Sequence, residues 1–221
     1  HRDLHSFPTR RSSDLLFLVY GDHLIPMAQK KGVIVEIITS NPDKEGTLYD
    51  KSLMDELQQA ETYFDQIAVC KKDQTPRISD RVLIMDDVQD PDNVGALIRS
   101  AAAFGFLHII LSPHCADLYN EKTIRASKGS IFDVYVERKN LSQALTDLKL
   151  QGYQLLYADA HESGSHEPSQ KTALIVGNEG RGISDEVKKR SDGAIHIETR
   201  HVESLNVSVA GAILMYLWRI L

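Results

Sequence analysis

Two segments, Arg81–Asp87 and Thr172–Gly177, have the pattern of strands that are apolar on both faces, and they constrain the fold more than any other feature. Such strands are typical of a parallel sheet that is covered by helices on each side. Helical spacing alternates with further apolar runs around them. We expect additional strands over 108–112, 153–160 and 194–197, and helices over 93–104, 141–153, 184–190 and 206–218. This alternation predicts an α/β domain with a largely parallel sheet.

A smaller α/β domain is predicted before it, over residues 16–73. Its β-branched runs predict strands over 17–21, 33–39 and 67–72, and helical spacing predicts helices over 23–32 and 52–60. Residues 74–80 are polar and contain a proline, which is typical of a linker, so the larger domain spans 81–221. Residues 1–15 fit neither pattern, and we expect them to be non-native or disordered.

The distribution of charge matters more here than its sum. The 221-residue chain has a formal net charge of −6, which by itself argues against a nucleic-acid partner. Eight acidic residues and two lysines lie between Gly32 and Ala68, so this segment alone carries −6 and the rest of the chain is balanced. A balanced remainder can still hold local basic patches, and phosphate contacts depend on those patches.

Two further features limit the class of protein. The apolar C-terminal segment, Val207–Leu221, is interrupted by polar residues and is too short to span a bilayer, so no membrane contact is expected. Cys70 and Cys115 lack the spacing of a metal site, and the histidines form no ligand-spaced cluster. We therefore expect no metal and a reducing, cytoplasmic location.

The first segment with chemical potential is Asp90–Gly105, DPDNVGALIRSAAAFG. Asp92 or Asn93 is a good N-cap for a helix that Gly105 would close. The small residues Gly95, Ala102 and Ala103 lie one turn from Arg99 on the same face. They predict close approach by another helix or by a ligand. A well-capped packing helix and a helix that presents an arginine to phosphate are both compatible with this pattern.

The second segment, Ala173–Ser184, is an apolar strand that runs into ALIVGNEGRGIS. Glycines at the carboxyl end of a strand let a ligand approach the backbone. The order GxxGxG differs from the dinucleotide fingerprint GxGxxG, although Glu198 stands about twenty residues further on, as that fingerprint requires. A plain turn is the other interpretation.

The third segment is His201–Tyr216, HVESLNVSVAGAILMY. Ser204 or Asn206 can cap the last helix. The helix would bury Val207, Ala210, Gly211, Leu214 and Trp218. Taken alone, this segment is compatible with a C-terminal helix that packs tightly through small residues.

The three segments, in this order and spacing, resemble the signature motifs of the SpoU/TrmH family of RNA 2′-O-methyltransferases, within the SPOUT class. The resemblance covers Arg81 to the C-terminus. A weaker one covers Phe17–Lys72, which looks like the small ribosomal-protein-like substrate-binding domain that often precedes this catalytic domain. The resemblance implies that the C-terminal segment threads a loop to form a trefoil knot, in which S-adenosylmethionine binds.

By motif position, the resemblance implies cofactor contacts from Gly177, Gly180, Ile197, Leu205 and Asn206. It implies a catalytic set of Asn93, Arg99, Glu179, Ser204 and Asn206, with Glu179 organising the glycine loop. The family usually has Ile-Pro-Met where this chain has Ile197-Glu198-Thr199, so the motif can be aligned on Ile195 or on Ile197.

The resemblance also implies an RNA substrate, rRNA rather than tRNA, and a homodimer. Among the basic residues we favour Arg125 and Lys128, which lie three positions apart on a predicted helical turn, together with Arg99, as RNA contacts. Small residues on two helices, among them Gly95 and Gly211, suit a two-fold interface. Two alternatives stay open: a non-catalytic RNA-binding member of the family, and a SPOUT enzyme that methylates a base.

Overall fold

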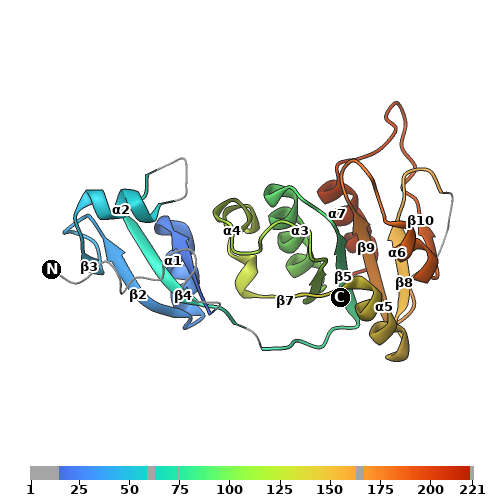
Figure 1. The fold of residues 1–221 in the computed structure, drawn as a ribbon, viewed down its shortest axis with the longest axis horizontal. Coiled ribbons are helices and arrows are strands. Elements are labelled where there is room, and N and C mark those ends of the chain that lie inside the picture. The colour runs from blue at the N-terminus through green and yellow to red at the C-terminus, as the bar shows by residue number, and fades with distance from the viewer. Residues whose placement is uncertain (1–14, 59–62, 74, 163–166, 220–221) are drawn as a thin grey trace. The chain divides into compact units, whose positions relative to one another are not determined.

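A computed structural model describes residues 15–58, 63–73, 75–162 and 167–219, and the chain forms two compact units, His1–Asp73 and Gln74–Leu221 (Figure 1). In the described part of unit 1, the sheet has the order β1-β4-β2-β3. Its strands are β1 (Leu16–Tyr20), β2 (Ile34–Thr39), β3 (Thr47–Leu48) and β4 (Gln66–Lys71), and its helices are α1 (Gly21–Lys30) and α2 (Lys51–Leu57).

Unit 1 matches the expected strands closely, and it adds a short one. The core contains Tyr20, Ile38, Met54 and Ile67, which come from β1, β2, α2 and β4. β3, which was not predicted, pairs parallel with β2. The helix expected over 52–60 ends at Leu57, because Gln58 is already extended, and residues 59–60 lie outside the described residues.

Unit 2 has a six-stranded sheet in the order β10-β8-β9-β5-β6-β7 among its described residues, and every pair is parallel. The expectation of a parallel α/β sheet is confirmed. The strands are β5 (Arg81–Asp86), β6 (His108–Leu111), β7 (Tyr135–Arg138), β8 (Gln154–Ala158), β9 (Thr172–Gly177) and β10 (Gly193–Ile195). The helices are α3 (Pro91–Phe104), α4 (Glu121–Ser127), α5 (Leu141–Leu150), α6 (Asp185–Arg190) and α7 (Val207–Leu217), with a 3₁₀ turn, η2 (Ser130–Phe132).

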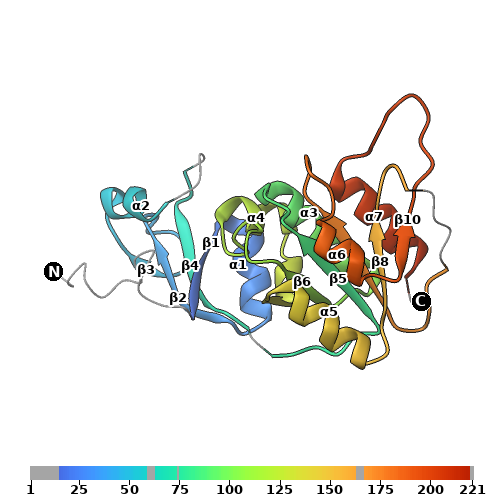
Figure 2. The same cartoon turned by 45° about the vertical axis from the view of Figure 1, so that its right-hand side comes forward.

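Helices cover both faces of this sheet, with α3, α4 and α7 on one side and α5 and α6 on the other (Figure 2). Strand alternation explains the division. Ile84 and Ile175 belong to the core that contains the apolar residues of α5 and α6. Val176, the next residue of β9, faces α7 beside Gly211. Both central strands are therefore buried on both faces, as their uninterrupted apolar sequence requires.

The start of α3, the end of β10 and the segment from α4 to β7 differ from expectation. The N-cap of α3 is Asp90 rather than Asp92 or Asn93, because Pro91 takes the first helical position and the Asp90 carboxylate accepts from the Asp92 N–H at 2.9 Å. β10 ends at Ile195, two residues before the expected end. The segment from α4 to β7 was not predicted to be structured, apart from a helical turn at Arg125 and Lys128. No helix in the described part of the chain is long and apolar enough to cross a membrane.

Candidate active site

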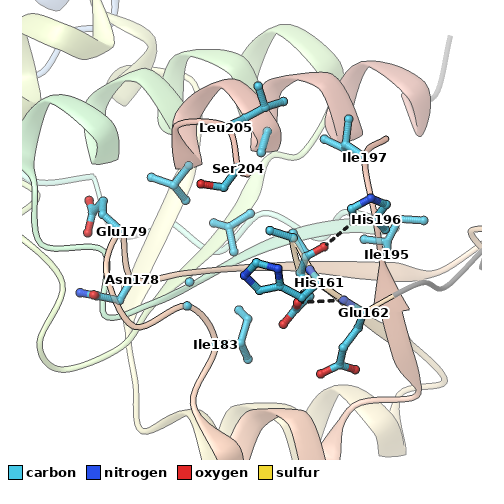
Figure 3. A pocket seen from close by; sticks show the side chains of 18 of the residues that line it. His161, Glu162, Asn178, Glu179, Ile183, Ile195, His196, Ile197, Ser204 and Leu205 are labelled. Atoms are coloured by element: carbon cyan, nitrogen blue, oxygen red, sulfur yellow. Dashed lines mark hydrogen bonds between the residues drawn. The ribbon is translucent and has the colours of Figure 1, made fainter. Parts of the chain in front are cut away.

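A cavity of about 650 Å³ lies at the carboxyl ends of β8, β9 and β10, beside the start of α7 (Figure 3). Ligands of open parallel sheets usually bind at this edge. Of the residues singled out from the sequence, seven line the cavity: Gly177, Glu179, Gly180, Ile197, Ser204, Leu205 and Asn206. Ile195 lines it as well, so both alignments of the motif bring an isoleucine to the same place.

The loop after β9 closes on itself through Asn178. The Asn178 N–H donates to the Gly182 carbonyl at 3.0 Å, and the Gly182 N–H donates back at 2.9 Å. The Asn178 side-chain oxygen accepts from the N–H groups of Gly180 and Arg181, both at 3.0 Å. A Cβ on Gly177 would lie 2.5 Å from the carbonyl carbon of Gly182. Gly177 is therefore required by the loop itself, in addition to any ligand.

Glu179 connects this loop to the start of α3. Its carboxylate accepts from the Asn93 side-chain amide at 3.0 Å and from the Asp90 N–H at 3.3 Å. Burial alone would raise the pKa of Glu179, but the hydrogen bonds from Asn93 and from backbone N–H groups outweigh it and hold the pKa below its ordinary value. Glu179 is thus an ionised residue that fixes the loop against the helix.

Asn93 also connects to the third segment, so it joins all three. Its side-chain oxygen accepts from the Asn206 amide at 3.1 Å. The Asn206 oxygen in turn accepts from the N–H of Ser208 at 2.8 Å and caps α7. We call Glu179, Asn93 and Asn206 the amide relay. Asn93 is buried, and neither composition nor local spacing indicated that its amide would lie between the other two side chains.

The remaining catalytic candidates lie apart from this relay. Ser204 is exposed, and its hydroxyl faces the cavity (Figure 3). Arg99 is exposed on α3 and does not line the cavity, and within the described residues it has no hydrogen bond or ion pair. Of the two partners expected beside Arg99, another helix or a ligand, the structure shows a helix at Gly95, where a Cβ would lie 2.5 Å from the Thr123 carbonyl oxygen of α4.

The basic residues considered for RNA binding differ in whether their side chains already have a partner in the described structure. Arg125 pairs with Glu121 one turn earlier, at 3.5 Å. Lys128 is exposed in the left-handed C-cap of α4 and has no ion pair in the described structure. Arg138, a further basic residue of this region, donates to the carbonyls of Ser112, Pro113, Cys115 and Ala116 and so holds a loop.

One wall of the cavity was not predicted from the sequence. Asp159 and Glu162, in the loop after β8, both pair with Lys188 of α6 at 2.8 Å. Lys188 is 29 and 26 positions from the two carboxylates and no motif joins them, so only the fold brings the lysine to this loop. In the described part of the chain, no group of three or more His, Cys, Asp or Glu side chains could hold a metal ion.

A model of the SpoU rRNA Methylase family matches residues 80–216 of this chain. The chain belongs to this family. Among the proteins similar to this chain, the 23S rRNA (guanosine(2553)-2′-O)-methyltransferase RlmP of Bacillus subtilis is 32% identical over 97% of this chain and 92% of its own length. A TrmH-family protein from Porphyromonas gingivalis superposes with a TM-score of 0.74 at 29% identity, over 92% and 89% of the two chains.

The SpoU methyltransferase AviRb from Streptomyces viridochromogenes, solved with AdoMet, superposes with a TM-score of 0.77 at 24% identity. The match covers 91% of this chain and 88% of AviRb. At 24% identity, this similarity shows that AviRb and this chain share a fold.

Proposed function

We propose that this chain transfers the methyl group of S-adenosylmethionine to a ribose 2′-hydroxyl of RNA, and that the RNA is rRNA rather than tRNA. The amide relay carries this proposal, because it joins the three SpoU motifs at one rim of a ligand-sized cavity. Membership of the family supports the reaction, and the similarity to RlmP along nearly the whole chain supports rRNA.

The cavity fits this cofactor in size and in lining. A volume of about 650 Å³ lies within the range of pockets that hold drug-sized ligands. Gly177 and Gly180 present backbone without side chains, whereas Ile197 and Leu205 supply apolar surface. When bound, the cofactor supplies an electrophilic methyl group on its sulfonium. AviRb, the fold relative, was solved with that cofactor.

Arg99 is assigned to the RNA side of the reaction. A ribose hydroxyl is a poor nucleophile until its proton leaves, but a guanidinium stays protonated in proteins and is a poor base. Arg99 therefore binds the phosphate beside the reacting ribose and stabilises the developing alkoxide, while a substrate phosphate accepts the proton. Ser204 and Asn206 complete the centre from the cavity rim.

Unit 1 is proposed to bind the RNA substrate, and its charges support this role. Lys71 and Lys72 donate backbone N–H groups to the carbonyls of Val33 and Leu15, so the end of β4 lies beside the chain that leaves α1 at Lys30 and Lys31. Four lysines thus gather at one end of the unit. At the other end, Lys44 pairs with Asp22 and Asp65 at 2.6 and 2.8 Å. The end of the unit that carries these four lysines is therefore the one proposed to contact phosphate.

We also propose the trefoil knot and the homodimer. The knot is supported by the course of the chain, which leaves β10 at the sheet edge and returns to α7, packed on β9 and α3. Two of the small residues expected at the interface, Gly95 and Gly211, are already covered by α4 and by Leu97 of the same chain, so they do not support the dimer. The outer face of α7 supplies a better reason: Val209, Ile213, Tyr216 and Leu217 are 36–63% exposed.

The test is methyl transfer from labelled S-adenosylmethionine to total rRNA and, separately, to tRNA. We expect label in rRNA, at a linkage that resists nuclease and alkaline cleavage, as a 2′-O-methyl group does. Label in a base would favour the SPOUT base methyltransferase. RNA binding without any transfer would favour the non-catalytic member. Labelling of tRNA alone would contradict the proposed substrate.

A further inference from the structure

The loop after β8, residues 159–162, is held to α6 by one lysine. The Lys188 ammonium lies 2.8 Å from Oδ2 of Asp159 and 2.8 Å from Oε1 of Glu162. The Tyr157 hydroxyl donates to the other oxygen of Glu162 at 2.5 Å. The ammonium also lies 5.5 Å from the centroid of the Tyr157 ring. The lysine therefore bridges two elements that both line the cavity.

This cluster is satisfied by its own members, so it holds the loop rather than a ligand. The second oxygen of Asp159 accepts from the backbone N–H groups of His161 at 2.8 Å and Glu162 at 3.1 Å. All four carboxylate oxygens of Asp159 and Glu162 thus have donors from the chain. The two carboxylates raise the pKa of Lys188, which keeps its positive charge in place.

His161 is the side chain that this loop presents. Its backbone is fixed by Asp159, but within the described residues its imidazole has no hydrogen bond or ion pair. The ring lines the cavity, and Figure 3 shows it reaching towards the loop that carries Asn178. The neighbouring His196 differs, because its Nδ1 lies 3.2 Å from the Asp159 carbonyl oxygen. A fixed loop that aims an unpartnered ring into a cavity is arranged for a ligand contact.

We propose that His161 contacts the adenosine half of the cofactor and that Lys188 is the residue that positions it. This inference rests on the proposed function of the cavity. The amide relay and Ser204 mark the rim where the methyl group is used. His161 instead belongs to the wall that also carries Ile183 and Ile195, where apolar side chains and a flat imidazole suit a purine base. One ring nitrogen remains available to hydrogen-bond the nucleoside.

Calorimetry on the full chain without RNA tests the contact. The probes are S-adenosylmethionine and 5′-methylthioadenosine, which lacks the amino-acid part. We expect His161→Ala to weaken both by the same factor, about five- to tenfold, the size of one lost polar or stacking contact. His114→Ala is the matched control, because His114 is also an exposed loop histidine but does not line the cavity.

A double-variant cycle tests the positioning role. Lys188→Met should weaken both probes, Lys188→Arg should restore most of the affinity, and Lys188→Met with His161→Ala should be no weaker than the worse single variant. Lys189→Met, on the exposed adjacent lysine, is the control. Additive losses would remove Lys188 from the proposal.

The outcomes separate this inference from the proposed function. Unchanged binding in His161→Ala overturns the contact alone, and a loss confined to S-adenosylmethionine overturns its assignment to the adenosine half. If the unaltered chain binds neither probe, the proposed function falls and this inference falls with it.

Discussion

At the scale of single residues, Asn93 shows how a local interpretation can miss the role of a side chain. Its position near the start of a predicted helix suggested a cap. Pro91 moves the cap to Asp90, and this frees the Asn93 amide to donate to Glu179 and accept from Asn206. The motif singled the residue out, and its catalytic role stays a prediction. Its contacts span 86 and 113 positions of sequence, which no local pattern could reveal.

Glu179 leads to a prediction about the stability of the fold at acidic pH. Its folded pKa lies below the ordinary value, so its stabilising contribution is complete above the unfolded pKa and is lost as the pH falls through the folded one. Glu179→Gln should therefore be less stable than the unaltered chain at neutral pH. The difference should shrink between about pH 5 and pH 3. Denaturant midpoints measured across that range would show it. A difference that does not change with pH would mean that Glu179 acts only through its shape.

Arg99 leads to a prediction about rate. Because it is exposed and does not line the cavity, Arg99→Ala should change the free energy of unfolding by less than about 0.5 kcal/mol. Calorimetry should find cofactor affinity unchanged. Turnover should fall on the order of 10²–10³-fold, as when a transition-state contact is removed. Arg99→Lys should recover little, because an ammonium lacks the planar fork. Near-normal turnover in the alanine variant would make Arg99 an ordinary surface residue.

At the scale of elements, the sequence predicted the long apolar strands and the amphipathic helices, but it missed β7 and indicated only one turn of α4. β7 and α4 are four and seven residues long. β7 has charged residues in half of its positions, and such a short strand is defined by its pairing with β6. The cavity was predictable only in part. Its glycine loop and α7 rim carry motifs, whereas the wall of Asp159, His161 and Lys188 comes from separate segments without one.

The glycine loop supplies a matched pair of variants. Gly177→Ala would place a Cβ 2.5–2.7 Å from the backbone of Gly182 and Ile183, which cannot move without opening the loop. We expect it to cost about 1–3 kcal/mol of stability and to abolish cofactor binding. A Cβ at Gly180 meets only the Asn178 side-chain oxygen at 3.7 Å, so Gly180→Ala should keep the stability of the unaltered chain and should weaken cofactor binding less than Gly177→Ala does. Thermal unfolding and calorimetry would compare them. Equal behaviour of the two would contradict the role given to the loop contact.

At the scale of the whole molecule, the exposed face of α7 is the predicted dimer interface. Ile213 lies between Val209 and Tyr216 on one helical stripe. Ile213→Asp would bury a carboxylate in an apolar interface, so light scattering should find a monomer. Leu150→Asp on α5 is the control, because Leu150 is 84% exposed outside this stripe. A dimer that survives Ile213→Asp would move the interface elsewhere.

Arg99 does not line the cavity of its own chain, and a homodimer is proposed. Together these two points predict that two inactive variants restore activity when they form a mixed dimer. If Arg99 acts in the partner's cavity, a mixed dimer of an Arg99→Ala chain and an Asn206→Ala chain holds one complete site. That site combines the intact cavity of the first chain with the intact arginine of the second. Each mixed dimer has one complete site out of two, so purified mixed dimer should recover about half of the unaltered activity. Each variant alone should be nearly inactive. The measurement is methyl transfer by the two co-expressed, differently tagged chains, purified through both tags in turn to enrich the mixed dimer. Mixed dimers that are as inactive as the dimers of either variant alone would mean that Arg99 acts at the cavity of its own chain. The RNA, rather than the partner chain, would then have to move to bring the two together.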